Sequence, residues 1–337
     1  MTVRTRIINW LREWMLAIAI AAGVSICLLY YSVPWLHAAG PVLRVTAAWA
    51  QPILLFVMLF LSLCRVSPKE VRPHRWQIAP LLVQCGVFIA LCLLLIAARS
   101  WEGSFFRWIG RHEILVQALL LCFITPTANS SVVVTGKLGG NVSECITYII
   151  LINLITSVLI PVFLPMAYPV EGMSFGRSML TILAKVFPLL IAPMLLAMAV
   201  RAWMPRLLAV VLRHPDWPFY LWSVLLVISI GLATRVAVLF EGSKLILLEL
   251  AGAALAACVI QFALGHRIGR RYDRRVTAGQ SLGQKNTSFT MWLGLTFLNP
   301  VVSAVGGFYS IWHNLYNTMQ LRRHQRQESH APSREQA

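Results

Sequence analysis

Two short polar stretches interrupt otherwise apolar runs, and each combines a helix breaker with groups that can bind a solute. The first, residues 122–135, contains Pro126, and the second, residues 277–288, contains Gly283 and Lys285. Proline lacks an amide hydrogen, so it disrupts the hydrogen-bond ladder of a helix. The second half of a broken helix begins with free N–H groups, and a helix N-terminus favours an anion. These stretches therefore predict the non-covalent binding of a small anion.

Hydroxyl and amide side chains surround both breaks. Thr127 and the three polar residues 129–131 can cap the half-helix that follows Pro126, and residues 286–287 begin the half-helix that follows Gly283. The predicted binding residues are Thr127, Asn129, Ser130, Ser131, Ser281, Gln284, Lys285, Asn286 and Thr287, with Pro126 and Gly283 as the helix breaks.

The elements that position these residues are helices in a lipid bilayer. Of the 337 residues, 58% are hydrophobic and only 12% are charged, whereas about 25% are charged in a soluble domain. Only helices and closed barrels satisfy their backbone in lipid, and the apolar runs lack the alternation of barrel strands. The net charge of +17 comes from clusters between these runs, as in cytoplasmic loops, so nucleic-acid binding is not expected. The predicted fold class is all-α integral membrane protein.

About ten segments are long and apolar enough to span the bilayer. Most Lys and Arg residues fall on one side of them, which places both termini in the cytoplasm and the chain in a cell inner membrane. We expect residues 1–168 to form a first five-helix repeat, residues 169–321 a second, and residues 322–337 a disordered cytoplasmic tail. The predicted spans are Glu13–Val33, Thr46–Cys64, Trp76–Ala98, Ile114–Leu138, Ser143–Pro165, Gly176–Trp203, Pro218–Leu239, Leu245–Leu264, Thr277–Leu298 and Val301–Leu321.

Each polar stretch lies in the fourth span of a five-span half. Breaks at matching places in two halves are typical of a transporter binding site at a repeat interface. Because five is odd, the two halves enter the membrane in opposite directions, which is the topology of an inverted repeat. The alternative for a single break is a kinked helix whose Ser and Thr side chains bind neighbouring helices.

Lys285 lies in the middle of the ninth span, where a charge is costly and indicates function. A buried lysine can lose its proton near neutral pH, so Lys285 could load and release a proton during transport. Alternatively, it stays charged and binds an anionic substrate directly. The structural alternative is a lysine that pairs with a carbonyl or carboxylate, or one that extends to the membrane interface.

The motifs around both breaks resemble those of the bile acid:sodium symporter superfamily. Residues 125–135 with 139–141 are similar to its fourth-helix motif, residues 283–286 to its ninth-helix Glu-x-Gly-x-Gln-Asn motif, and residues 57–69 to the end of its second helix. The resemblance covers most of the chain. It implies ten helices in a core domain and a panel domain, with broken helices 4 and 9 crossing in the core. It also implies transport of organic anions such as bile acids, pantoate and other carboxylates, usually with sodium.

The sequence departs from the family pattern where sodium would bind. The family's sodium-binding Glu falls on Ser281 and its Gln falls on Lys285. Exchanging a carboxylate for a hydroxyl and adding an ammonium inverts the local charge, so the resemblance implies that sodium coupling is lost or altered and that Lys285 stands in for a cation. The other family ligand positions are Ser131 and Val132, or Asn129 and Ser130 in a shifted alignment, together with Cys145 and Ile149.

These observations predict a secondary transporter of small organic anions, carboxylates or bile-acid-like, that works by alternating access. The expected partners are that anion and the lipid bilayer. No cofactor or metal site is expected, and the residues favour a proton over sodium as a coupling ion. The sequence leaves the substrate, the direction of transport, the coupling ion and the oligomeric state open.

Three other classes of protein were weighed. An arsenite-type metalloid exporter has the same fold, but such exporters resemble one another in a Cys beside the fourth-helix proline, whereas Cys122 lies four residues from Pro126. An intramembrane enzyme would need a motif such as HExxH or GxSxG, which the sequence lacks. A non-transporting membrane receptor would need an output domain, for which the tail is short.

Three further charges lie near or within predicted spans. Glu144, near the start of the fifth span, is expected either to pair with Lys137 or to be solvated. Lys185 and Glu249 lie about two to three turns inside their spans, where they could form an ion pair or line a pathway. The seven cysteines form no CxxC and are interpreted as small buried hydrophobic residues.

Overall fold

The computed structural model describes residues 3–66, 71–169, 172–214 and 216–330. Apart from one isolated bridge between residues 127 and 285, the regular structure in these ranges is helical, which confirms the all-α class. In chain order the elements are α1 (Val3–Ser32), η1 (Pro34–Ala39), α2 (Gly40–Leu63), α3 (Arg75–Ser100), α4 (Ser104–Arg111), α5 (Glu113–Ile124), α6 (Ser130–Lys137), α7 (Val142–Ala167), α8 (Phe175–Leu190), α9 (Ala192–Trp203), α10 (Pro205–Arg213), α11 (Trp217–Leu239), α12 (Leu245–Arg270), α13 (Arg275–Gly283), α14 (Thr287–Phe297), η3 (Pro300–Ser303) and α15 (Ala304–His330).

Five helices of the described chain are long and apolar enough to cross a membrane, and the number rises to seven if each of two bent pairs is one span. The five are α2, α3, α7, α11 and α12. One bent pair joins Ala17–Ser32 to Pro34–Leu43 at 107°, and the other joins α8 to α9 at 41°. The chain is therefore a membrane-embedded, multi-pass protein, as predicted.

The predicted spans that fail this test fail it either by length or by composition. The fourth and ninth are each divided into two helices, α5 with α6 and α13 with α14, of 8 to 12 residues. These halves are too short to pass, even where they are apolar, as α5 is. The tenth, Val301–Leu321, falls on η3 and the first part of α15, and α15 as a whole is less apolar.

The predicted disordered tail is wrong for residues 322–330, because α15 continues to His330. This segment is rich in Arg and Gln, which have high helix propensity, and it extends a helix that is already nucleated. The last part of the predicted tail, residues 331–337, lies outside the described residues.

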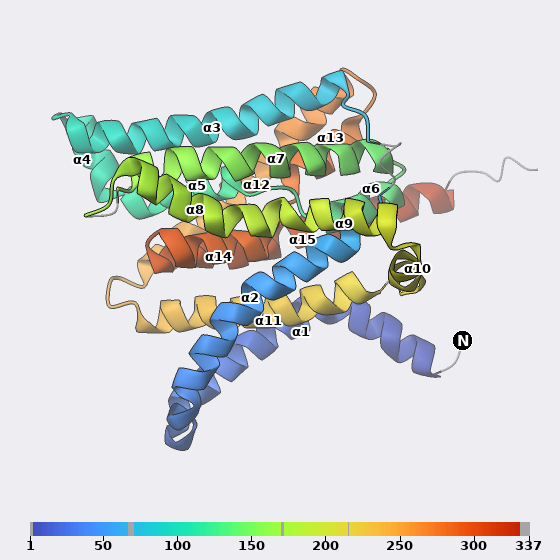
Figure 1. Ribbon diagram of the computed structural model, residues 1–337, viewed down its shortest axis with the longest axis horizontal. Helices are drawn as coiled ribbons and strands as arrows, with labels where there is room; N and C mark the ends of the chain where they lie inside the picture. Colours follow the sequence, from blue (N-terminus) through green and yellow to red (C-terminus); the bar gives the residue numbers. More distant parts are fainter. Residues whose placement is uncertain (1–2, 67–70, 170–171, 215, 331–337) are drawn as a thin grey trace, which may run out of the picture.

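The long helices run side by side, and two short ones lie at the ends of the bundle. In Figure 1, α3, α7, α8 and α11 follow the long axis, α2 crosses them obliquely, and α4 and α10 lie at opposite ends. The halves of the interrupted spans are distributed in the same way. Helices α5 and α14 lie toward the end that carries α4, and α6 and α13 lie toward the other end.

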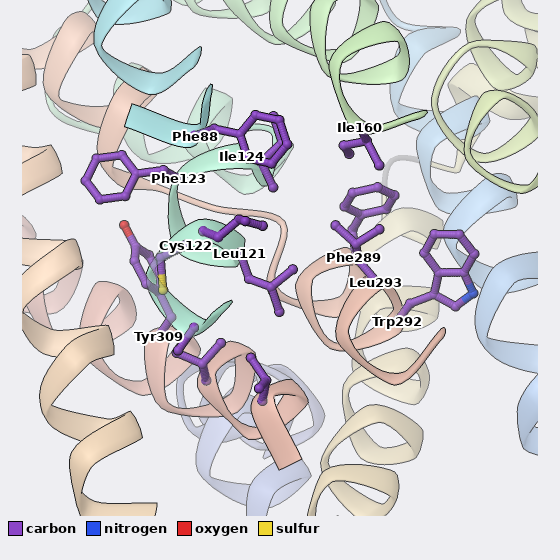
Figure 2. Close-up of a cluster of buried hydrophobic side chains, with 14 of the residues drawn as sticks. Phe88, Leu121, Cys122, Phe123, Ile124, Ile160, Phe289, Trp292, Leu293 and Tyr309 are labelled. Carbon is purple, nitrogen blue, oxygen red and sulfur yellow. The ribbon is translucent and has the colours of Figure 1, made fainter. Parts of the chain in front are cut away.

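The largest apolar cluster surrounds the end of α5, immediately before the first break. Leu121 and Ile124 pack with Phe88 of α3 and with Phe289 and Leu293 of α14, as Figure 2 shows. All five side chains are fully or almost fully buried. Because close-packed interiors resist displacement, this cluster fixes the end of α5 relative to the beginning of α14.

Candidate functional site

The two interrupted spans meet at their breaks. Residues 125–129 connect α5 to α6, and residues 284–286 connect α13 to α14. The two connections run antiparallel, with a bridge between Thr127 and Lys285. The two interrupted spans therefore cross at their predicted breaks, as the family resemblance implied.

Main-chain hydrogen bonds join the two connections. The N–H of Ala128 donates to the carbonyl of Gln284 at 3.2 Å, and the N–H of Asn286 donates to the carbonyl of Pro126 at 2.9 Å. A break inside a membrane is tolerated only where other groups satisfy the freed backbone. Here each break supplies partners for the other.

The first break follows from Pro126, but its predicted capping residues do not cap α6. Asn129 is the N-cap residue, and its side chain makes no capping hydrogen bond. The hydroxyl of Thr127 instead donates to the carbonyl of Ser281 at 2.5 Å, and Ser130 donates to Oε1 of Gln284 at 3.0 Å. These side chains therefore link α6 to the second span rather than satisfying their own helix.

The second half of the other span begins at residues 286–287, as predicted, and Asn286 caps it. The side-chain oxygen of Asn286 accepts from the N–H of Phe289 at 3.3 Å, and α14 begins at Thr287. Thr290, one turn further, donates to the hydroxyl of Thr125 at 3.0 Å. The start of α14 is therefore attached to both the main chain and a side chain of the first break.

Gly283 lies at the second break and also in a close helix contact. It is the last residue of α13, and the chain becomes extended at Gln284. A Cβ atom on Gly283 would lie 2.4 Å from the ring of Phe262 in α12. The absence of a side chain at this position therefore allows α12 and α13 to approach closely, a packing role that the sequence did not indicate.

Lys285 is the charged residue of the crossing, and it is almost completely buried, with 1% of its surface exposed. Its Nζ atom has no hydrogen-bond partner among the residues that the structure describes. The side chains of Cys122 and Cys85 are close enough to interact with it electrostatically. A buried amine with free donors can bind an anion or a carbonyl strongly, because leaving it unbonded is costly.

Three fully buried hydroxyl side chains surround the sulfur of Cys145, which is itself fully buried. The hydroxyl of Ser131 lies 3.4 Å from Sγ, and those of Thr135 and Ser281 each lie 3.6 Å from it. The structure therefore gathers three of the positions to which the family resemblance assigns sodium ligands, residues 131, 145 and 281. They offer a thiol and neutral hydroxyls, whereas hard cations prefer oxygen ligands and carboxylates.

The remaining family ligand positions do not add to that group. Val132 and Ile149 carry hydrocarbon side chains. Asn129 and Ser130, the alternative pair, lie at the start of α6, where Asn129 is partly buried and Ser130 is exposed. Ser130 bonds to Gln284 and not to the group around Cys145.

A series of amide side chains leads from the accessible break toward α15. Gln284 accepts from Ser130 and donates to Gln280, which in turn donates to Oε1 of Gln320 at 2.6 Å. Nε2 of Gln320 lies 3.1 Å from Nε2 of His266. Gln284, a predicted binding residue, is therefore held in orientation by its neighbours.

The sequence analysis missed a polar face on α15. Four buried residues each carry a side-chain atom without a hydrogen-bond partner in the described chain. Ser303 lies in η3, immediately before α15, and the other three lie in α15: Ser310, His313 and Asn317. Their spacings of seven, three and four residues place them on one face of a helix. That face lies against α14, since a Cβ on Gly306 would lie 2.9 Å from the carbonyl of Thr287. Helical periodicity of the polar residues in the tenth span would have revealed it.

Glu144 is neither solvated nor paired with Lys137. It is 3% exposed and accepts hydrogen bonds from Trp76 Nε1 at 2.5 Å and from Arg274 Nε at 2.9 Å. Asn141 also donates to it, at 3.0 Å. This carboxylate therefore ties α3, α7 and the beginning of α13 together at one end of the bundle.

Lys185 and Glu249 do not form the ion pair that the sequence left open. Both side chains are exposed, and neither is recorded in an ion pair in the described part of the chain. The ammonium of Lys185 lies 5.4 Å from the centre of the Phe297 ring.

Comparison with known proteins gives a family match. The model of the SBF-like CPA transporter family covers residues 14–321, a range that includes both interrupted spans. No curated protein matches the chain.

Proposed function

This chain belongs to the SBF-like CPA transporter family, and we propose that it is a secondary transporter of small organic anions that works by alternating access. The family match confirms the resemblance to bile acid:sodium symporters and makes the chain a membrane transporter. The observation that carries the choice of an anion is the buried amine of Lys285 at the crossing of the two breaks, which has no hydrogen-bond partner among the described residues.

Two half-helices add to the positive potential at that crossing. Helices α6 and α14 both begin there, at Ser130 and Thr287. The N-terminal end of a helix carries a partial positive charge, which attracts anions at transporter sites of this kind. Together with the amine of Lys285, these ends favour a carboxylate over a cation as the bound group.

We propose that the architecture is the ten-span inverted repeat of residues 1–168 and 169–321, with both termini in the cytoplasm of an inner membrane. The antiparallel pairing of the breaks supports this arrangement, because two halves that enter the membrane in opposite directions bring their fourth spans together in opposite directions. The basic clusters between the spans support the orientation.

Sodium is not the coupling ion in this proposal. The group around Cys145 offers a thiol and hydroxyls where a sodium site would need several oxygen ligands, and Lys285 carries the positive charge instead. Lys285 either remains charged throughout or takes up and releases a proton at Nζ as the site alternates.

The test is uptake of a panel of carboxylates by proteoliposomes that contain the purified protein. We expect uptake of one or more carboxylates that is equal in sodium and potassium media. A proton-carrying Lys285 predicts stimulation by a pH gradient, whereas a permanently charged Lys285 predicts none. A strict requirement for sodium, or no uptake of any anion on the panel, would contradict the proposal.

A further inference from the structure

Lys185 lies on α8 at the border between the packed face and the exposed face of that helix. Ser178, Ile182 and Leu189 are all buried, and they lie seven residues before, three residues before and four residues after Lys185. Residues at these spacings are neighbours on a helix surface. Lys185 itself is exposed, as is Thr181 on its other side. The edge of the packed face of α8 is therefore accessible at Lys185.

The ammonium group of Lys185 is directed toward α14. It lies 5.4 Å from the centre of the Phe297 ring, and Phe297 is the last residue of α14. Trp292 packs edge-on against that ring, with the two ring centres 5.7 Å apart. A cation over an aromatic face is attracted by the ring but keeps its N–H donors free for other partners.

The depth of Lys185 makes this exposure informative. Ten residues separate it from the start of α8 at Phe175, which corresponds to about 15 Å along the helix. Helix α8 forms a candidate span together with α9. A charge at that depth is expected to face a partner or water, and within the described chain no carboxylate pairs with it.

Helix α14 connects this position to the crossing of the two breaks. It begins two residues after Lys285 and ends at Phe297, and its 11 residues correspond to about 16 Å. Lys185 and Lys285 thus lie at opposite ends of the same half-helix. An anion that moves between them would pass along α14 from one positive charge to the other.

We propose that Lys185 is a second anion-binding residue, at a water-accessible opening between α8 and the end of α14, where it takes the carboxylate of an organic anion whose apolar part lies against Phe297. This inference rests on the proposed function, since the anion is the one that the protein transports. It assigns to Lys185 the binding of that anion before or after its passage through the crossing.

The first experiment tests the opening itself and does not depend on transport. Lys185→Cys and Leu180→Cys proteins in proteoliposomes are treated, on both sides, with a thiosulfonate reagent that carries a sulfonate. Leu180 is 60% exposed but points about 140° away from Lys185 around α8, so it faces lipid. The unmodified protein measures the background from native cysteines, which are buried or partly buried in the described chain.

Cysteine at position 185 should react at least about tenfold faster than cysteine at position 180, because a charged reagent and a thiolate both require water. A carboxylate from the panel should slow the reaction at 185 alone. Equal rates at the two positions, or no reaction at 185, would overturn the inference.

The second experiment measures uptake by Lys185→Met, Lys185→Arg and, as a control on the same helix, Arg177→Gln. Loss of the ammonium should raise KM about tenfold and leave kcat within about twofold, while Arg and the control keep KM near that of the unmodified protein. An unchanged KM in Lys185→Met would contradict the inference even if the proposed function holds. If the unmodified protein transports no anion, the proposed function fails and the labelling result alone decides on the opening.

Discussion

The two breaks pair with each other, but they differ in their cause, their exposure and their charge. The first contains Pro126 and is accessible at its end, where Asn129 is partly buried and Ser130, the first residue of α6, is exposed. The second contains no proline, and both Gln284 and Lys285 are 1% exposed. We infer that the first break contacts the solute directly, while the second break supplies the positive charge of Lys285. The two segments would then have separate roles in one binding site.

The second break also depends on the first for its shape. Its extended main chain donates to the carbonyl of Pro126 and accepts from the N–H of Ala128. The first break contains Pro126, which lacks an amide hydrogen, whereas residues 284–286 contain no proline and become extended next to a partner that is already extended. The first break thus holds the second, charged break in its extended shape. Substitutions that remove the charge and substitutions that disturb the packing should therefore affect uptake and stability differently.

The largest effect is expected for substitutions of Lys285, which remove the positive charge of the second break. Lys285→Met and Lys285→Gln should lower carboxylate uptake about 100-fold or more, since a buried ammonium is lost where an anion binds. Uptake by proteoliposomes over a range of pH measures this, and Lys137→Met, an exposed lysine at the end of α6, is the control. Unchanged uptake with unchanged pH dependence would show that the charge is not used.

The next effect concerns the close packing that supports the second break. Gly283→Ala should lower the free energy of unfolding by about 1–3 kcal/mol, because the added Cβ would lie 2.4 Å from the Phe262 ring. Thermal unfolding in detergent measures this. Gly86→Ala in α3, where a Cβ meets nothing within 4 Å, should have no such cost and should gain about 1 kcal/mol from helix propensity. Equal melting temperatures for the two variants would contradict the packing role.

The third prediction compares the stability lost when the buried carboxylate of Glu144 or the more exposed carboxylate of Glu113 is replaced. Glu144→Gln should destabilise the protein by about 1–2 kcal/mol, because Arg274 and the indole of Trp76 lose a buried anionic acceptor. Glu113 pairs with Arg99 at 2.8 Å, but both side chains are more than one third exposed, so Glu113→Gln should cost no more than about 0.5 kcal/mol. Chemical denaturation that ranks the two variants in the opposite order would show that the end of α13 is held by other contacts.

The smallest effect is expected at the open break. Ser130→Ala removes a hydroxyl that is exposed and bonded to Gln284, so KM for the transported carboxylate should rise about two- to tenfold with little change in kcat. Thr181→Ala, which removes an exposed hydroxyl bonded only to its own helix, is the matched control. A fall in kcat as large as that of Lys285→Met would contradict the inference that the first break contributes contact with the solute and the second break contributes charge.

The sequence by itself determined the features that depend on local chemistry. Long apolar runs without the alternation of barrel strands become helices in lipid, Pro126 removes a backbone hydrogen bond from a helix, and Asn286 is a residue type that caps a helix. For this reason the all-α class, the positions of both interruptions and the cap of α14 could be predicted from residue types and their spacing.

Only the tertiary structure decided which groups face one another. The side chain of Thr127 binds a carbonyl 154 residues away instead of capping its own helix, and Glu144 pairs with Arg274 across 130 residues instead of with nearby Lys137. Gly283 is needed because Phe262 of another helix lies against it. The polar face of α15 is buried only because other helices, such as α14, pack against it. Hydrogen bonds and steric contacts extend over a few ångströms in space, and sequence separation does not encode that distance.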